Sequence, residues 1–277
     1  MSVTHYVHGY SETECQRLRD QAQTLAELLH HDTVYPAGSR VLEAGCGVGA
    51  QTVILAGNNP SALFTSIDVS SDSLKDANAA AQGAGLGNVT FQVADIFQLP
   101  FPRASFDHAF LCFVLEHLKE PGKALRHLKT VLKPGGTLTV IEGDHGSTFF
   151  HPSSAAAWRT IQCLIDLQAA AGGDALIGRR LFPLLCGAGF RDVTVSPRFV
   201  YVDASRPAWV EGFTRDTYIA MVEGVRERAL AAGLIDLPAW KKGIAELKAS
   251  AGSDGTFCYT FFKAVAVNGP EPGHKYS

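Results

Sequence analysis

Short apolar runs that end at an acidic or polar residue recur through the first half of the chain. Most are followed by a stretch with apolar residues at helical spacing. Continuous apolar runs, in place of strict alternation, are typical of strands that are covered on both faces. The pattern therefore predicts a doubly wound α/β domain with a parallel sheet. Its five predicted strands are RVLEAG, LFTSID, NVTFQVAD, FDHAFLCF and TLTVIEGD.

Helical patterns precede and follow this region. SETECQRLRDQAQTLAELLHH begins with Ser11 as an expected N-cap and Glu14 completing a capping box. After the fifth strand, SSAAAWRTIQCLIDLQAAAG and GRRLFPLLCGAGF predict helices, and RDVTVSPRFVYVD predicts a strand. A long helical piece over residues 205–250 precedes a last strand, TFCYTFFKAVAV.

No repeat or composition shift marks a flexible linker, so we expect a single domain with a helical elaboration. Its expected parts are an N-terminal helical lid (1–38), a Rossmann-like core (39–204), a helical cap insertion (205–254), a final strand (255–267) and a tail (268–277).

Composition narrows the function classes. The 277 residues are 46% hydrophobic, and 24 Lys and Arg stand against 27 Asp and Glu without long runs of one sign. No broad basic face is available to attract nucleic acid or anionic lipid. The first thirty residues are typical of neither a signal peptide nor a membrane span, and the six cysteines are scattered. We expect a cytoplasmic protein with a small-molecule partner.

A glycine-rich turn follows the first predicted strand in RVLEAGCGVGAQ. Gly45, Gly47 and Gly49 occupy alternate positions, where a tight turn lets a ligand approach the backbone and directs helix N–H groups at it. A nucleotide-like ligand is implied. The turn also fits the dinucleotide pattern G-x-G-x-x-G/A with Ala50 in the last place, so this motif leaves NAD open.

Three acids end three successive strands: Glu43, Asp68 and Asp95. Asp68 lies where an acid accepts hydrogen bonds from a ribose diol, which both ligand classes require. Glu43 and Asp95 favour a ligand with a cationic sulfur and amino group over a dinucleotide, whose pyrophosphate disfavours nearby carboxylates. The three acids together suit S-adenosylmethionine, with S-adenosylhomocysteine as its product.

Five motifs in order carry a family resemblance: VLEAGCGVGAQT, SID, VADIFQLPFPRASFD, FVLEHL and LKPGGTLTVIE. Residues 40–144 resemble the class I S-adenosylmethionine-dependent methyltransferases, particularly the ubiquinone and menaquinone biosynthesis group. The resemblance implies a seven-stranded sheet whose last strand, TFCYTFFKAVAV, runs antiparallel. The long helical insertion departs from the minimal fold.

The resemblance also implies the cofactor contacts, carried over from matching motifs except for Tyr10, which precedes them and would otherwise be a surface staple residue before Ser11. Gly45 and Gly47 would lie against the cofactor, with Glu43 near its methionine end and Asp68 on the ribose hydroxyls. The other expected contacts are Val69 on adenine, Asp95 and the Ile96 N–H on its polar edge, the Leu111 or Cys112 carbonyl on the amino group, and Tyr10 toward the methionine carboxylate.

Methyl transfer from a sulfonium is a direct displacement, so positioning supplies much of the rate, and a base matters when the acceptor is a hydroxyl or an ammonium. His145 in IEGDHG is the leading candidate base, because its ordinary pKa lies near working pH. Glu142 and Asp144 would orient the imidazole or pair with a cationic substrate, or else satisfy loop backbone groups. For His117 and His151 a packing role is favoured.

Aromatic residues gather in the segments expected to cover the substrate, where they would form walls for a flat or cationic acceptor or the core between cap and sheet. The apolar stripe of RDTYIAMVEGVRERALAAGL would pack inside the cap or form a dimer face, which leaves monomer and homodimer open. No zinc spacing, P-loop or G-x-S-x-G elbow occurs, so no metal is expected. An NAD-dependent oxidoreductase and a non-catalytic S-adenosylmethionine-binding module are the alternatives.

Overall fold

The computed structural model describes residues 12–269, with side chains from residue 16 onward. Within these residues seven strands form one sheet in the order β3-β2-β1-β4-β5-β7-β6. Strands β1 to β5 run parallel, and β7 is antiparallel to both β5 and β6. This confirms the predicted sheet. The strands are β1 (Arg40–Ala44), β2 (Leu63–Asp68), β3 (Val89–Val93), β4 (Phe106–Cys112), β5 (Leu132–His151), β6 (Arg191–Asp203) and β7 (Thr256–Val267).

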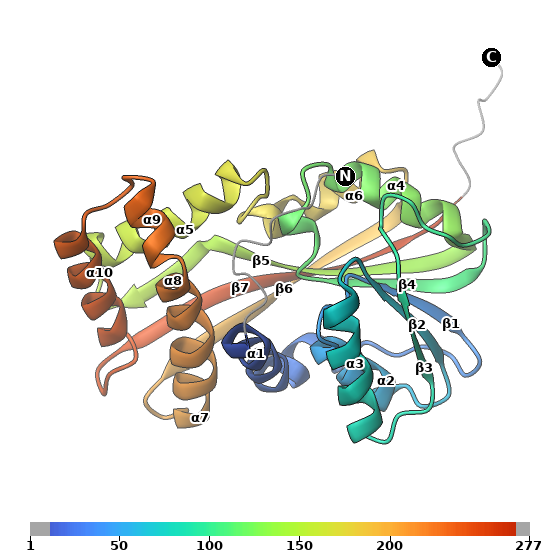
Figure 1. The fold of residues 1–277 in the computed structure, drawn as a ribbon, viewed down its shortest axis with the longest axis horizontal. Coiled ribbons are helices and arrows are strands. Elements are labelled where there is room, and N and C mark those ends of the chain that lie inside the picture. Colours follow the sequence, from blue (N-terminus) through green and yellow to red (C-terminus); the bar gives the residue numbers. More distant parts are fainter. Residues whose placement is uncertain (1–11, 270–277) are drawn as a thin grey trace, which may run out of the picture.

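Helices cover both faces of this sheet. Figure 1 shows α4 and α6 on one side and α1, α2 and α3 on the other. The helices are α1 (Glu12–His30), α2 (Ala50–Asn58), α3 (Ser71–Gly83), α4 (Pro121–Val131), α5 (Ala155–Ala170), α6 (Leu181–Gly187), α7 (Pro207–Trp209), α8 (Ala220–Gly224), α9 (Arg226–Ala231) and α10 (Leu237–Ala249), with 3₁₀ turns η1 (Leu115–His117) and η2 (Ile177–Arg180) and a π-helix η3 (Val210–Ile219). No helix in this part of the chain is long and apolar enough to cross a membrane.

The continuous apolar strands serve two cores at once. Successive residues of a strand point to opposite faces, so Val41 and Phe110 join the core beneath α1 and α2, and Leu42 and Leu111 join the core beneath α4 and α6. All four side chains are fully buried. Burial on both faces is the physical reason why these strands lack the alternation of a half-exposed sheet.

β5 is longer than the predicted strand TLTVIEGD. It spans 20 residues and extends through LKPGG before that strand, where the sequence predicts a turn at KPGG, and through HGSTFFH after it. The pairing partner explains the difference, because antiparallel β7 continues alongside β5 to His151. Between Asp144 and Phe149 the register shifts, and this bulge in β5 places His145 out of the regular ladder.

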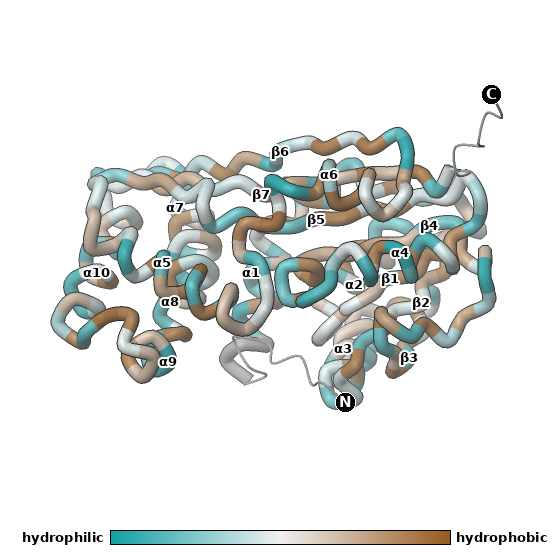
Figure 2. Tube along the Cα trace, turned by 90° about the horizontal axis from the view of Figure 1, so that it is seen from above, coloured by the Kyte–Doolittle hydropathy of each residue, from teal (hydrophilic) through white to brown (hydrophobic). Residues whose placement is uncertain are grey.

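The segment between β6 and β7 contains α7, η3, α8, α9 and α10, and we refer to it as the cap. Figure 2 shows this cap, with α5, at one end of the sheet and α2 and α3 at the other, with α1 between the two groups. Gly212 of η3 faces α1 so closely that a Cβ there would lie 2.5 Å from Thr24 Oγ1. The N-terminal helix therefore packs directly against the cap.

Candidate functional site

The glycine turn joins β1 to α2. Gly45, Gly47 and Gly49 have φ of +76°, +51° and +77°, a backbone region that L side chains rarely adopt. A Cβ on Gly45 would lie 2.7 Å from Val114 Cγ2, and a Cβ on Gly49 would lie 2.9 Å from Ala77 Cα. By contrast, nothing lies within 4 Å of a Cβ on Gly47. Gly47 thus borders open space, as a backbone that receives a ligand must.

Asp68 ends β2 beside this turn and holds it in place. Its Oδ2 accepts a hydrogen bond from the Gly47 N–H at 2.9 Å, and Oδ1 accepts one from the Ser70 N–H at 2.9 Å. The next residue, Val69, is 61% exposed although it is apolar. A half-buried carboxylate next to an exposed apolar side chain fits a ribose diol followed by a flat base.

Glu43 lies under the turn. Its side chain is buried, and Oε2 accepts hydrogen bonds from Thr52 Oγ1 at 2.7 Å and Ser66 Oγ at 2.6 Å. Burial raises the pKa of this carboxyl, and the two hydroxyl donors offset part of the shift. Glu43 therefore connects β1, β2 and α2 directly beneath the glycines.

The remaining predicted cofactor residues lie at the same edge of the sheet. Asp95 is exposed and accepts a hydrogen bond from the Phe97 N–H at 2.8 Å, while the Ile96 side chain is buried. Leu111 and Cys112 end β4 and are also buried. Tyr10 lies outside the described residues.

Glu142 supports the turn that follows β4. Its Oε1 accepts hydrogen bonds from the Val114 N–H at 3.0 Å and the Leu115 N–H at 2.7 Å. The side chain is fully buried, which raises the pKa of the carboxyl well above its usual range, and the charge of Glu116 acts in the same direction. These contacts fix Val114 against Gly45. They are not contacts with His145, so they favour a positioning role for Glu142.

His145 lies in the bulge of β5 and is 5% exposed. Its backbone N–H donates to the Ala175 carbonyl at 3.0 Å, and its Nδ1 lies 3.1 Å from the Tyr259 hydroxyl. Burial lowers the pKa of the imidazole; the carboxylates of Glu116 and Asp144 oppose this shift. The ring is thus neutral at physiological pH and able to accept a proton.

Asp144 forms an ion pair with Arg179, not a contact that would orient His145. Arg179 donates to both carboxylate oxygens, from Nε at 2.6 Å and from Nη2 at 2.7 Å. Such bidentate pairs are strong and geometrically specific. The expectation that Asp144 satisfies groups around its own loop is also met, because Oδ1 accepts the Gly146 N–H at 3.0 Å.

Most of the aromatic residues of the cap are core. Phe213 and Tyr218 of η3 are buried against three aromatic residues of β7, with ring centroids no more than 6.0 Å apart. Phe149 and Phe199 are instead about half exposed and stack on each other at 6.0 Å. The three β7 residues, Phe257, Tyr259 and Phe261, were not among the residues that the sequence singled out.

The only sequence signal for these three β7 aromatic residues is the alternation in TFCYTFF. Alternation does not reveal which face of the sheet packs against the cap.

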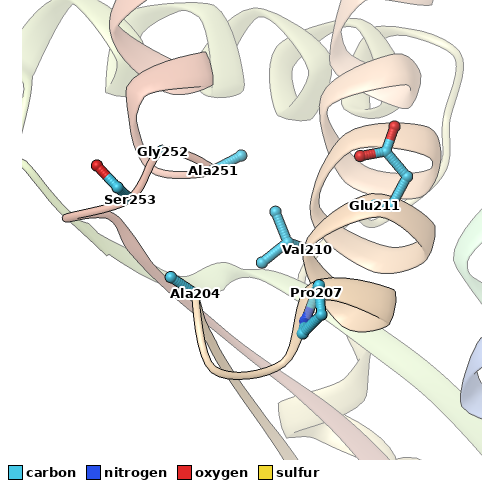
Figure 3. Close-up of a pocket in the computed structure, with 7 residues that line it drawn as sticks. All are labelled: Ala204, Pro207, Val210, Glu211, Ala251, Gly252 and Ser253. Atoms are coloured by element: carbon cyan, nitrogen blue, oxygen red, sulfur yellow. The ribbon is translucent and has the colours of Figure 1, made fainter.

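Two surface hollows lie away from these residues. One, of about 220 Å³, lies between the segment that begins η3 and the loop that precedes β7 (Figure 3). None of the predicted site residues lines it. The other, about 250 Å³, lies near the start of β4 and the buried Lys263. Neither contributes to the arrangement around the glycine turn and His145.

The comparisons with known proteins agree with this geometry. Residues 42–140 match the methyltransferase domain family. An O-methyltransferase of Pyrenophora dematioidea is 30% identical over 193 residues, which cover 67% of this chain and 68% of the relative. The chain belongs to the S-adenosylmethionine-dependent methyltransferases.

Two further relatives of this methyltransferase extend the match. The 27-O-demethylrifamycin SV methyltransferase of Amycolatopsis mediterranei is 28% identical over 80% of this chain and 76% of its own length. The crystal structure of the [4+2]-cyclase SpnF shares 25% identity and a TM-score of 0.55 over 91% of this chain and 82% of that one. S-adenosylmethionine is accordingly the cofactor, and the NAD alternative left open by the glycine turn is set aside.

The groups around the glycine turn fit this cofactor. Gly47 borders open space, the Asp68 carboxylate is only half-buried, and Val69 is exposed. No cluster of three metal-ligating side chains occurs among the residues that the structure describes.

Proposed function

We propose that this methyltransferase transfers the methyl group to a hydroxyl oxygen of a small organic molecule, with His145 as the general base. The observation that carries the proposal is the position of a neutral, buried imidazole in the β5 bulge, beneath the cap and beyond the carboxyl ends of the parallel strands. Ligands of such folds bind at that edge. Two relatives, a 27-O-demethylrifamycin SV methyltransferase and an O-methyltransferase, support oxygen as the acceptor atom.

The proposed reaction balances with few groups. When bound, S-adenosylmethionine would supply an activated methyl group, and its sulfonium would become the uncharged thioether of S-adenosylhomocysteine. The acceptor oxygen forms the new bond to carbon as the bond between carbon and sulfur breaks, and the hydroxyl proton passes to Nε2 of His145. Alignment of donor and acceptor in one closed site supplies much of the rate, and the base contributes about 10²- to 10⁴-fold.

Different residues of the chain would contact the cofactor and position it. Asp68 would accept hydrogen bonds from the ribose hydroxyls while its Gly47 contact keeps the turn open, and Val69 would pack on adenine. Asp95 and the Ile96 N–H would contact the polar edge of adenine. Glu43 and Glu142, both buried, would position the methionine end by fixing the glycine turn and the turn after β4.

The acceptor would occupy the space between α1, the cap and the β5 bulge. We interpret residues 12–38, the described part of the expected lid, together with the cap over residues 205–254, as the segments that exclude water from this space. The neighbouring side chains include the Tyr218 and Tyr259 rings at 6.0 and 5.7 Å from the His145 ring. Neutral aromatic walls favour a flat acceptor such as a phenol or a quinol.

The test combines S-adenosylmethionine carrying an isotopic label in its methyl group with a panel of hydroxylated aromatic compounds. Each compound is paired with its own methyl ether, and products are identified by mass spectrometry. We expect label in a new O-methyl group from the free hydroxyls only, with a loss of about 10²-fold or more in His145→Ala. Label found on nitrogen or carbon alone would contradict the proposal.

A further inference from the structure

A buried tyrosine of β7 is the hydrogen-bonding partner of His145. The Tyr259 hydroxyl lies 3.1 Å from Nδ1 of His145, and the two side chains are 2% and 5% exposed. The pair joins strands far apart in the sequence, because His145 lies in the β5 bulge and Tyr259 in β7. Imidazole nitrogens differ in role according to the hydrogen bond that each one makes.

The hydroxyl of Tyr259 occupies a slot that a glycine provides. A Cβ on Gly143 would overlap the Tyr259 hydroxyl oxygen, so any side chain at this position would push the hydroxyl away from His145. The Tyr259 ring is held in turn by Phe213 and Phe261, whose ring centroids lie 6.0 and 4.7 Å away. The hydroxyl therefore has a fixed position beside Nδ1.

A second buried tyrosine in the same region has a different partner. Tyr218, on η3, is 1% exposed, and its hydroxyl lies 2.7 Å from Thr148 Oγ1. Both phenols have a raised pKa, chiefly because of burial, and stay uncharged. The two tyrosines are thus alike in burial and chemistry, but the hydrogen bond with the His145 ring nitrogen belongs to Tyr259.

Several charged groups influence this imidazole through their charges. Glu116 and His117 face it from η1, Asp144 from β5 and Arg17 from α1. Opposite signs are present, so their influences on the charge of His145 partly cancel. The hydrogen bond with Tyr259 at Nδ1 is the direct contact on which the tautomer of the ring depends.

We propose that Tyr259 is a positioning residue that holds the proton of neutral His145 on Nδ1 and leaves the lone pair of Nε2 directed at the acceptor hydroxyl. The inference rests on the proposed function and extends it. In the neutral state Nδ1–H donates to the phenol oxygen. When Nε2 takes up the acceptor's proton, the same hydrogen bond remains in place and no group has to turn.

The first test needs no acceptor. Nitrogen-15 histidine NMR of the full chain, with His145→Gln to assign the resonance, reports which nitrogen carries the proton. We expect the proton on Nδ1 in the parent protein and a mixture of tautomers in Tyr259→Phe. The matched control Tyr218→Phe, which removes an equally buried hydroxyl, is expected to keep the parent spectrum. A parent spectrum with the proton on Nε2, or identical spectra for the parent and Tyr259→Phe, would overturn the proposal.

A second variant keeps the hydroxyl but displaces it. Gly143→Ala places a methyl group against the Tyr259 oxygen, so we expect the same tautomer change as in Tyr259→Phe. If Gly143→Ala kept the parent tautomer while the protein stayed folded, the slot would not position the hydroxyl and the inference would fail.

Measurements of turnover distinguish a failure of this inference from a failure of the proposed function. Once an acceptor is identified, Tyr259→Phe should lower kcat by about 10- to 100-fold with KM unchanged, whereas Tyr218→Phe should lower it much less. Equal losses in the two variants would assign Tyr259 a merely structural role. An altered tautomer without any O-methyl product in the parent would overturn the proposed reaction but leave the positioning of His145 intact.

Discussion

The Asp68 carboxylate already accepts two backbone hydrogen bonds before any ligand arrives, from Gly47 and Ser70. Asp68→Ala should therefore loosen the glycine turn and remove the proposed ribose contact at once. We expect the Kd for S-adenosylhomocysteine to rise about 10- to 100-fold, since hydrogen bonds to charged groups contribute about 1.5–3 kcal/mol each. Calorimetric titration measures it. Asp76→Ala, an exposed acid on α3, is the control, and unchanged affinity in Asp68→Ala would remove Asp68 from the ribose site.

The pKa of His145 sets the expected pH dependence of turnover. Because burial lowers this pKa below the ordinary value of 6.5, the imidazole is neutral at pH 7 and becomes protonated only at more acidic pH. A protonated imidazole cannot accept the acceptor's proton. We expect kcat/KM to be flat from about pH 7 upward and to fall as the pH drops below 6.5 through the lowered pKa.

The measurement is a pH profile of the parent protein and of His145→Ala. The variant should be slow at every pH and lack the acidic limb. A parent profile that rises only above pH 8 would place the essential base elsewhere.

At the level of single residues, a motif predicts the position of a residue where that position depends on neighbours in the sequence. Glu43 lies near the end of β1, Asp68 ends β2 and Val69 follows it, so their positions could be predicted from the glycine turn and the strand ends. Tyr259 and Val114 could not be predicted. Their roles come from contacts with His145 and Gly45 across strands distant in sequence, and no local pattern encodes which strands become neighbours.

The glycine turn provides a prediction at the level of elements. Gly49→Ala combines a positive φ with a Cβ 2.9 Å from Ala77 Cα in α3, so it should destabilise the protein by about 2–4 kcal/mol. Gly47→Ala carries the same kind of backbone strain but meets no atom of the chain within 4 Å, so its cost should be about 1–2 kcal/mol. Chemical denaturation of the two variants compares these costs.

Cofactor affinity should follow a different order. The Gly47→Ala methyl group enters the space assigned to the ligand, so we expect at least a tenfold loss in S-adenosylhomocysteine affinity, measured by calorimetry. Normal affinity in Gly47→Ala would mean that the cofactor does not approach this glycine.

β5 shows what element prediction from the sequence misses. The helices and strands of the chain were predicted in the right order, because apolar periodicity and flanking turns mark them. The predicted bounds of β6 and β7 match the observed ones. The extension of β5 through KPGG and, after Asp144, through HGSTFFH was not predicted. Glycines and polar residues are typical of turns, but here the ladder with β7 continues on either side of a bulge, and that pairing is a tertiary effect.

At the level of the whole molecule, the long strands β5 and β7 connect the two ends of the sheet. β5 and β7 run from the side covered by α4 and α6 to the cap, and α1 lies between the cap and α2 (Figures 1 and 2). One sheet therefore carries the cofactor turn, the His145 bulge and the cap. A shift of β7 relative to β5 would move Tyr259 away from His145, so the fold and the proposed chemistry depend on the same strand pairing.

The chain after α1 is tied to β7 by a buried cation. Lys263 is 2% exposed, and its Nζ donates to Asp32 Oδ1 at 2.5 Å, to Thr33 Oγ1 at 2.6 Å and to the Leu29 carbonyl at 3.2 Å. Arg198 of β6 pairs with the other oxygen of Asp32. Burial opposes ionisation of Asp32, but these two cations hold its pKa at about 2.

Asp32→Asn should leave the Lys263 charge buried without its counter-charge. Loss of a partner in a buried pair costs about 3–5 kcal/mol, and because the Asp32 side chain is 44% exposed we expect about 2 kcal/mol here. Since the folded pKa of Asp32 is depressed from 3.8, its contribution is complete above that pH and is lost as the pH falls toward 2. The difference in unfolding free energy between the parent and Asp32→Asn should therefore be constant near neutral pH and shrink below about pH 4. Denaturant unfolding at several pH values measures it, with Asp166→Asn, an exposed acid on α5, as the control. Equal stability of Asp32→Asn and the parent at pH 7 would show that the threonine and carbonyl contacts alone hold Lys263 and, with it, the junction between α1 and β7.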